Sequence, residues 1–307
     1  WRIWQYSKTR NLYDWIEMKR FLILIPVYND WDSLTKLLNK IGENIKNIKR
    51  AQFDCVVVND CSTIKNHKIK IPSEINSIKI IHMSKNKGHA RCNAFGIKYL
   101  SENSDFDYLI LMDGDGEDRP EEIKLLVDKV LLDPNKSVVA KRVKRSEGFI
   151  FQMLYRFHKY LTLFTTCKLI NFGNYSCLTK NDLKTLSTKA SLWSSFSGSF
   201  KYNIKNYNEV NSIRGMRYFG PTQMSLFKLV IHSFSIIAVF KYRLFFISLA
   251  LLASLHYLGI FIKFNFLLFQ ILTVFFNILV FIVSFRESEK DLRNSKFDIA
   301  KIENFTH

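Results

Sequence analysis

The sequence predicts an α/β protein with a Rossmann-like, mostly parallel sheet, followed by an interfacial helix and a transmembrane hairpin. Between residues 19 and 142, short continuous apolar runs alternate with segments whose apolar residues recur at helical spacing. Continuous apolar runs are typical of strands buried on both faces, and strand–helix alternation favours a parallel sheet. Residues 224–285, by contrast, are almost continuously apolar, which is typical of membrane helices.

The individual elements follow from apolar runs that end in turn-forming residues. The predicted strands are 21–27, 53–60, 77–84, 108–113 and 137–142, and the predicted helices between them are 31–45 and 88–102. A further helix follows residue 113, because Pro120, Glu121 and Glu122 are residue types expected in a first helical turn. After Gly148 the periodicity is helical, and then it becomes irregular through residues 170–220.

The chain is expected to have five segments. They are an N-terminal extension of unknown role (1–18), an α/β domain (19–220), an interfacial amphipathic helix (221–243), a transmembrane hairpin (244–285) and a polar cytoplasmic tail (286–307). Met18 stands directly before the first strand, where a natural start would lie. Residues 1–17 are therefore interpreted as an upstream extension or a fragment artefact.

The predicted hairpin consists of two uncharged stretches, 244–262 and 264–285, separated by Lys263. A helix needs roughly 20 residues to cross a hydrocarbon core of about 30 Å, so both stretches are long enough. A buried hairpin in a soluble protein is the alternative. Basic residues flank both outer ends, so the positive-inside rule predicts a multi-pass protein of the cytoplasmic (inner) membrane whose α/β domain is cytoplasmic.

The formal net charge of +18 indicates which classes of partner the protein could bind. A basic surface suits anionic lipid, to which each Lys or Arg contributes roughly 1 kcal/mol. Nucleic acid is the competing partner, but the sequence shows no helix-turn-helix, zinc or RNA-binding signature, so none is expected. The five cysteines are odd in number and lack C-x-x-C spacing, which argues against a disulfide framework and a zinc site.

Carboxylates gather beyond one predicted strand, in YLILMDGDGEDRPEE (108–122). Asp113 and Asp115 bracket one residue, so both side chains can reach one point beyond the strand. Two hard oxygen ligands suit Mg²⁺ or Mn²⁺, and water and substrate phosphates complete the shell. The alternative is a solvated acidic loop that caps the next helix. Asp30, Asp60 and Lys85 follow other strand ends, where doubly wound sheets bind ligands, and this favours the metal site.

The chain resembles the nucleotide-sugar-binding half of family 2 glycosyltransferases, which have the GT-A fold. Four segments in this order carry the resemblance, IPVYND (25–30), VVVNDCST (56–63), NKGHARCNAFGIKYL (86–100) and LMDGDGEDRPEEI (111–123). The branch that it is most similar to contains dolichol-phosphate mannose synthases and bacterial polyprenyl-phosphate glycosyltransferases, whose catalytic domain is often followed by membrane helices. The resemblance implies an inverting transfer from a UDP- or GDP-sugar, with Mg²⁺ or Mn²⁺ as cofactor.

The resemblance also implies which residues bind the nucleotide. They are Pro26, Tyr28, Asn29, Asp30, Asp60, Asn86, Gly88, Arg91 and Asp113. Those at 26–30 would line the base and ribose pocket, and Asp60 would hold the base or ribose. The loop and helix start at 86–91 would face the nucleotide, because a helix N-terminus favours phosphate.

The catalytic and metal-binding residues are implied in the same way. The metal ligands would be Asp113 and Asp115, with Glu117 and Asp118 as an adjoining acidic pair. The catalytic candidates are Asp115, Asp118, Arg142 and Arg217, and further cationic candidates are Arg145 and Arg214. The planar fork of an arginine suits a diphosphate or an acceptor phosphate.

Two departures from the family bear on the acceptor. Asn171 and Asn174 stand where many relatives have aspartates, which removes an obvious general base. A phosphate monoester, whose second pKa is about 6, needs no such base, so the acceptor is interpreted as a polyprenyl phosphate. The second departure is Thr222-Gln223 in place of a Ser-Lys pair, which leaves Arg217 as the substitute contact.

Two alternative functions stay open. Asp118 could serve as base for a glycan or lipid hydroxyl in cell-surface polysaccharide synthesis, which keeps the fold and changes the acceptor. A non-catalytic membrane scaffold would keep the fold without turnover, although the intact Asp113-x-Asp115 and Asp60 argue against it. The sequence leaves the sugar, the nucleotide and the oligomeric state open.

Overall fold

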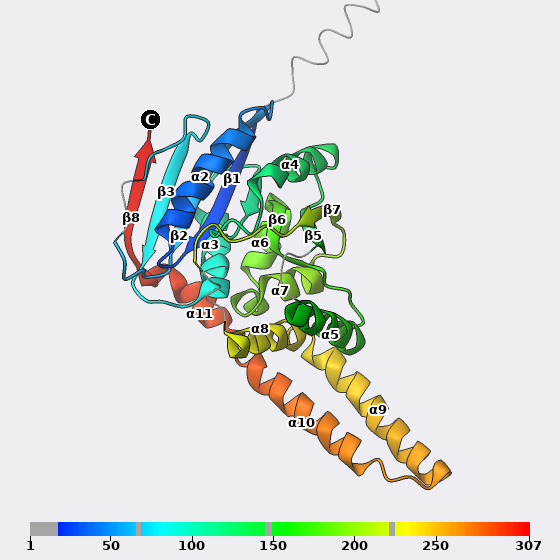
Figure 1. Ribbon diagram of the computed structural model, residues 1–307. Coiled ribbons are helices and arrows are strands. Elements are labelled where there is room, and N and C mark those ends of the chain that lie inside the picture. Colours follow the sequence, from blue (N-terminus) through cyan, green and yellow to red (C-terminus); the bar gives the residue numbers. More distant parts are fainter. Residues whose placement is uncertain (1–17, 66–68, 145–148, 221–224) are drawn as a thin grey trace, which may run out of the picture.

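The computed structural model of the protein describes residues 18–65, 69–144, 149–220 and 225–307. Within these ranges, one eight-stranded sheet has the order β7-β5-β6-β4-β1-β2-β3-β8 and carries helices on both faces (Figure 1). The strands are β1 Lys19–Val27, β2 Ala51–Asn59, β3 Ser77–Met83, β4 Tyr108–Leu111, β5 Val138–Lys144, β6 Phe172–Thr179, β7 Asn208–Ile213 and β8 Ile299–Thr306. The α-helices are α2 Trp31–Ile45, α3 His89–Asn103, α4 Ile123–Leu132, α5 Phe149–Thr166, α6 Lys180–Ser187, α7 Phe196–Asn203, α8 Leu226–Ala238, α9 Lys241–Ile262, α10 Leu267–Ser284 and α11 Glu289–Asn294. Three short 3₁₀ helices are η1 Pro120–Glu122, η2 Ala190–Trp193 and η3 Ser295–Asp298.

The central block of the sheet is parallel. β1 pairs in parallel with β2 and with β4, and β2 pairs in parallel with β3. Antiparallel pairs then place β6 beside β4 and β8 beside β3. The predicted fold class, a mostly parallel α/β sheet, is therefore confirmed, and four parallel strands end at the same edge.

Both faces of the sheet pack on helices, which explains the continuous apolar runs. Successive residues of a strand point to opposite faces. Ile23 of β1 therefore joins a core with α2 and α4, whereas its neighbour Leu24 joins a core with α3 and α7. A strand that is buried on both faces has no position for an alternating polar side chain.

Helix α3 packs against β1 at a glycine. A Cβ atom on Gly96 would lie 2.6 Å from both Cδ atoms of Leu24, whose side chain is fully buried. Since protein interiors are close-packed, only glycine lets the helix backbone approach the sheet this closely. The same helix carries His89 in its first turn, beside Asp113 at the end of β4.

The C-terminal segment corrects the prediction. Residues 286–307, expected to be a polar tail, instead form α11, η3 and β8, and β8 pairs antiparallel with β3. Ile302 pairs with Ile81, and Phe305 packs against the core on the α2 face. An edge strand exposes most of its side chains and commonly carries charge, so its composition resembles that of a tail.

Helices α9 and α10 form an antiparallel hairpin that projects from the α/β domain (Figure 1). Both are long and apolar enough to span a membrane, and only 6% and 11% of their most apolar windows are buried. A core hairpin of a soluble protein would bury these side chains, so that alternative is disfavoured. The predicted interfacial helix, 221–243, begins outside the described residues, and α8 lies within its remainder.

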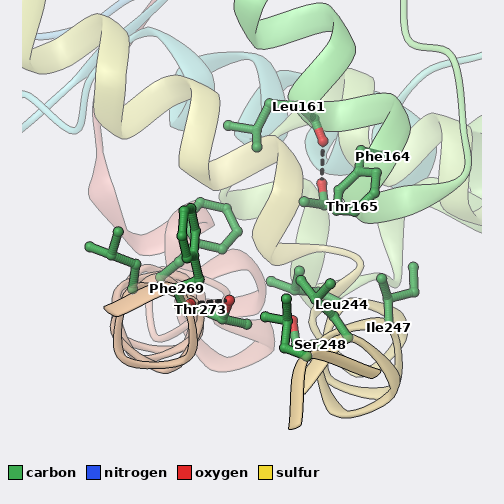
Figure 2. Close-up of a pocket in the computed structure, with 12 residues that line it drawn as sticks. Leu161, Phe164, Thr165, Leu244, Ile247, Ser248, Phe269 and Thr273 are labelled. Carbon is green, nitrogen blue, oxygen red and sulfur yellow. Dashed lines mark hydrogen bonds between the residues drawn. The ribbon is translucent and has the colours of Figure 1, made fainter. Parts of the chain in front are cut away.

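An apolar cavity of about 330 Å³ lies between α5 and the hairpin (Figure 2). Leu161 of α5, Leu244 of α9 and Phe269 of α10 line it from three sides. The hydroxyls of Thr165 and Thr273 donate to carbonyl oxygens of their own helices, those of Leu161 and Phe269, at 2.8 Å each. The lining of the cavity is therefore almost entirely apolar.

Gly96→Ala is expected to destabilise the domain, because the new methyl group has no space beside Leu24. Overpacking of a filled core typically costs about 1–3 kcal/mol, which lowers the Tm by several degrees. Thermal unfolding of the detergent-solubilised chain, followed by tryptophan fluorescence, measures the change. Leu24→Ala supplies the control. The double variant should lose less free energy of unfolding than the sum of the losses of the two single variants. Strict additivity would contradict the close approach of Gly96 and Leu24.

Candidate active site

The carboxyl ends of the parallel strands bring together polar side chains from distant parts of the sequence. Asn29 and Asp30 follow β1, Asp60 follows β2 and Asp113 lies just beyond β4. In a doubly wound sheet this edge is where ligands bind. The structure thus gathers at one edge the acidic residues that the sequence analysis selects.

Asn29 ties the end of β1 to the loop that follows β2. Its φ of 52° is a left-handed conformation that asparagine tolerates better than most residues. Its Oδ1 accepts hydrogen bonds from the backbone N–H of Thr63 at 2.8 Å and of Ile64 at 3.1 Å. Pro26 and Tyr28 flank the same edge, and Tyr28 is 45% exposed. A base and ribose pocket at these residues stays a prediction.

Asp60 holds the turn that leads into α3. The residue is 3% exposed, and its carboxylate accepts hydrogen bonds from the backbone N–H of Lys87 at 2.7 Å and of Gly88 at 2.8 Å. Gly88 has a φ of 90°, which favours glycine. Asn86 is exposed in the same turn. Asp60 therefore shapes the loop that is predicted to face the nucleotide, while its own contact with base or ribose stays a prediction.

Asp113 is the centre of a small polar network. Its Oδ1 lies 3.1 Å from His89 Nε2 and accepts a hydrogen bond from Asn174 Nδ2 at 3.0 Å. Asp118 also contacts Asp113, because its Oδ2 accepts a hydrogen bond from the backbone N–H of Asp113 at 3.0 Å. The acidic loop thus folds back on itself and connects β4 to α3 and β6.

Arg217 joins two carboxylates from different strand ends. Its NH1 donates to Asp115 Oδ2 and its NH2 to Asp30 Oδ2, each at 2.6 Å. Arg214, three residues earlier, pairs with Glu117 in the acidic loop. Both arginines follow β7, so this segment supplies positive charge to the loop after β4.

Backbone contacts hold the segment after β7 against the acidic loop. Gly215 N donates to the carbonyl of Glu117 at 2.8 Å, and Tyr218 N donates to the carbonyl of Asp115 at 2.9 Å. A Cβ on Gly116 would lie 2.6 Å from the Tyr218 ring, and the φ of Gly116 is 88°. The loop therefore needs glycine here for its conformation and for the ring that covers it.

The crowded carboxylates perturb the pKa of one another. Burial, together with the charges of Asp113 and Glu117, raises the pKa of Asp115 to about 6. Burial and the charge of Asp113 raise the pKa of Asp118 to about 7. Burial also works against the charge of Asp113, but His89 and Asn174 hold its pKa well below the usual range. Negative charge is thus concentrated around Asp113.

A divalent cation fits this concentration of negative charge. Asp113 and Asp115 offer the hard oxygen donors that Mg²⁺ and Mn²⁺ prefer. Among the described residues, no group of three or more His, Cys, Asp or Glu side chains could hold a metal ion by itself. An ion bound by two carboxylates completes its shell with water and phosphate oxygens, as Mg²⁺ usually does. The donor set therefore suits an ion that arrives with a phosphorylated ligand.

Arg142 of β5 approaches the acidic loop beside β6. Its NH2 lies 3.8 Å from Asp118 Oδ1. A Cβ on Gly173 would lie 2.5 Å from the same nitrogen, so glycine leaves the room that the guanidinium occupies. Arg145 and the pair at 222–223 lie outside the described residues. The catalytic roles assigned to Arg142 and Arg217 stay predictions, although both side chains reach the acidic loop.

Sequence reasoning missed the role of His89. It follows the glycine that opens α3, its side chain is 44% exposed, and the negative charge of Asp113 raises its pKa to about 9. Asn174, noted only as a replaced aspartate, lies 2.9 Å from the same ring nitrogen and bonds to Asp113. The one available signal in the sequence was an ionisable side chain at the first position of a predicted helix. Its partner, Asp113, is distant in sequence, so the contact itself could not be predicted.

The sequence model described as Glycosyl transferase family 2 matches residues 22–217. Two curated relatives are named Undecaprenyl-phosphate 4-deoxy-4-formamido-L-arabinose transferase. The protein from Klebsiella pneumoniae (strain 342) is 26% identical over 52% of this chain and 48% of its own length. The protein from Salmonella choleraesuis (strain SC-B67) is 26% identical over 54% of this chain and 50% of its own length. The chain thus spans about half the length of these curated relatives.

A solved structure supports the fold. Glucosyl-3-phosphoglycerate synthase from Mycobacterium tuberculosis, in complex with Mn²⁺, UDP-glucose and phosphoglyceric acid, is similar with a TM-score of 0.51 and 15% sequence identity. The match covers 74% of this chain and 80% of that one. At this identity the likeness concerns the fold alone, and it confirms the predicted GT-A architecture.

Asp115→Asn is expected to weaken Mn²⁺-dependent binding of UDP or GDP at least about tenfold, because it would remove one of the two predicted charged oxygen ligands. Isothermal titration of the full chain in detergent measures the affinities, and the Tm reports whether the variant folds. Asp128→Asn is the matched control, since Asp128 is an exposed carboxylate of α4 paired with Lys124. Equal nucleotide affinities for the folded Asp115 variant and the unchanged chain would remove Asp115 from the metal site.

Proposed function

Because the chain belongs to glycosyl transferase family 2 and is a glycosyltransferase, we propose that it moves a sugar from a UDP- or GDP-sugar to a polyprenyl phosphate at a membrane surface. Two features outside the site support this acceptor. The curated relatives carry undecaprenyl phosphate in their names, and α9 and α10 are candidate membrane spans. Membership of an enzyme family also disfavours the non-catalytic scaffold.

One observation carries the choice of acceptor. Asn174 lies in β6 and Asn171 lies directly before that strand. A hydroxyl acceptor would need a base at these positions, and both carry amides instead. Asn174 donates to Asp113, and Asn171 is 7% exposed with its Oδ1 unpaired among the described residues. Neither amide can take a proton at neutral pH. A phosphate oxygen suits such a site, because it is already largely anionic at pH 7.

On this proposal Asp113 and Asp115 hold a Mg²⁺ or Mn²⁺ ion together with the donor diphosphate. When bound, the ion would neutralise charge on the nucleoside diphosphate as it leaves. Asn174 and His89 would keep the Asp113 carboxylate in position. Arg142 and Arg217, which both reach the acidic loop, would add positive charge on the donor side.

A hydroxyl acceptor is the second candidate, and one observation favours it. Burial and neighbouring charge raise the pKa of Asp118 to about 7, which suits a general base. The geometry of the same residue weighs against this role. Asp118 is 3% exposed, and its carboxylate accepts a hydrogen bond from the backbone of Asp113. A base must reach the proton that it removes, so the phosphate acceptor is preferred.

We further propose that the protein lies in the cytoplasmic membrane with its α/β domain on the cytoplasmic side. Lys241 and Arg243 lie in the first turn of α9, and Arg286 follows the end of α10, as the positive-inside rule requires of cytoplasmic ends. Both ends of the hairpin connect to the same domain, through α8 on one side and through α11 and β8 on the other. An even number of spans is consistent with that connection.

The acceptor is tested by incubating the full chain with undecaprenyl phosphate and a panel of isotopically labelled UDP- and GDP-sugars. We expect one donor to give a lipid whose mass equals undecaprenyl phosphate plus one sugar, detected by mass spectrometry. Undecaprenol, which lacks the phosphate, is the control acceptor and should give no product. A glycosylated lipid or glycan without a polyprenyl-phosphate linkage would overturn the proposal in favour of the hydroxyl acceptor.

The orientation is tested by cysteine labelling of cells with a membrane-impermeant maleimide. Lys263→Cys, at the exposed turn between α9 and α10, is expected to label in intact spheroplasts. The native Cys167, exposed at the end of α5, should label only after permeabilisation and serves as internal control. Labelling of position 263 only after permeabilisation would mean that the turn does not cross the membrane.

A further inference from the structure

Two arginines lie at the corner where the hairpin of α9 and α10 joins the α/β domain. Arg91 lies in the first turn of α3, and its guanidinium carbon is 5.7 Å from the centre of the Trp193 ring in η2. Arg286 lies two residues beyond the end of α10. Helix α11, which begins three residues later, packs against both α3 and η2. The chain thus brings two cations from distant segments to one corner of the domain.

These two arginines are unpaired, unlike the neighbouring cations. Lys241 pairs with Glu287 at 2.8 Å, and Arg243 donates to the carbonyl of Thr166 at 2.7 Å. No described carboxylate lies within ion-pair distance of Arg91 or Arg286. The Nε of Arg91 is buried and has no hydrogen-bond partner among the described residues. A buried donor without a partner costs free energy that a ligand oxygen would recover.

The charges of the two guanidinium groups act on each other. Burial and then the positive charge of Arg91 lower the pKa of Arg286. Arg91 is half-buried, whereas Arg286 is exposed. Like charges on neighbouring groups repel, and an anion placed between them relieves the repulsion. A guanidinium binds phosphate through parallel N–H donors, which gives both strength and orientation.

We propose that Arg91 and Arg286 form a binding site for the phosphate monoester head group of a membrane lipid. Arg91 is two residues from His89, whose ring contacts Asp113 in the candidate active site. Arg286 is close to the end of an apolar helix that is a candidate membrane span. A phosphate between them would have its lipid tail at the membrane boundary and would lie near the first turn of α3, which also carries His89.

This inference deepens the proposed function, because it states how the lipid acceptor presents its phosphate. It also reassigns Arg91, which the sequence analysis placed beside the nucleotide. The donor side keeps Asp113, Asp115 and the arginines that reach the acidic loop, Arg142 and Arg217. Donor and acceptor phosphates would then be held by separate groups of cations.

Native mass spectrometry of the full chain in detergent tests the site without any donor. The probes are dioleoyl phosphatidic acid, which is a phosphate monoester, dioleoyl phosphatidylglycerol, which is a diester, and inorganic phosphate. We expect phosphatidic acid to bind at least about tenfold more tightly than phosphatidylglycerol. Arg286→Gln should remove that preference, whereas Arg286→Lys, which keeps the charge, should retain part of it.

The matched control is Lys290→Gln, which removes one positive charge from an exposed position of the neighbouring helix α11. It should leave the affinity for phosphatidic acid unchanged, since general surface charge is not the cause. Arg91→Gln combined with Arg286→Gln should cost little more than either change alone, because both residues hold one phosphate. Equal losses in the Lys290 and Arg286 variants, or full additivity of the two arginine changes, would overturn the site.

Two further outcomes distinguish a lipid phosphate from soluble phosphate, and the proposed site from the proposed reaction. Inorganic phosphate that binds as tightly as phosphatidic acid would show a site for soluble phosphate and overturn the lipid assignment. Because no donor is present, binding is independent of transfer. A chain that prefers phosphatidic acid through Arg286 but makes no glycosylated undecaprenyl phosphate would keep this site and lose the proposed reaction. A chain that makes glycosylated undecaprenyl phosphate but shows no preference for phosphatidic acid would support the reaction and exclude the site.

Discussion

A carboxylate that is partly withdrawn from water at the end of a buried strand needs a partner, and this requirement governs the arrangement around the acidic loop. Asp113 receives His89 and Asn174, while Asp115 and Asp30 share Arg217. These partners come from α3, β6 and the segment after β7. The charge at one strand end therefore determines how three other parts of the chain must be placed.

The same arrangement links the site to the core behind it. Helix α3 can present His89 to Asp113 because Gly96 lets its backbone lie against Leu24 of β1. Gly116 and Gly173 have comparable roles, since each leaves space for a side chain that covers or approaches the acidic loop. Close packing and charge compensation thus act together, and polar groups of the site are positioned by contacts made elsewhere.

The elements that could be predicted from the sequence are those whose signal is local. A strand buried on both faces, such as β1, shows itself as a continuous apolar run, and η1 shows itself by Pro120 and two glutamates in a first turn. Strand β8 gave no such signal, because an edge strand with one neighbour exposes its polar residues. Pairs such as His89 with Asp113 depend on tertiary contact, which neither spacing nor composition encodes.

Strand β8 has a consequence for how the protein is made. The strand that completes the sheet beside β3 lies after α9 and α10 in the chain, so it leaves the ribosome only after both apolar helices have done so. Until then the edge of β3 has no neighbour on that side among the described strands. Completion of the sheet therefore waits until the hairpin has been synthesised, so the order of the chain sets the order of the two events.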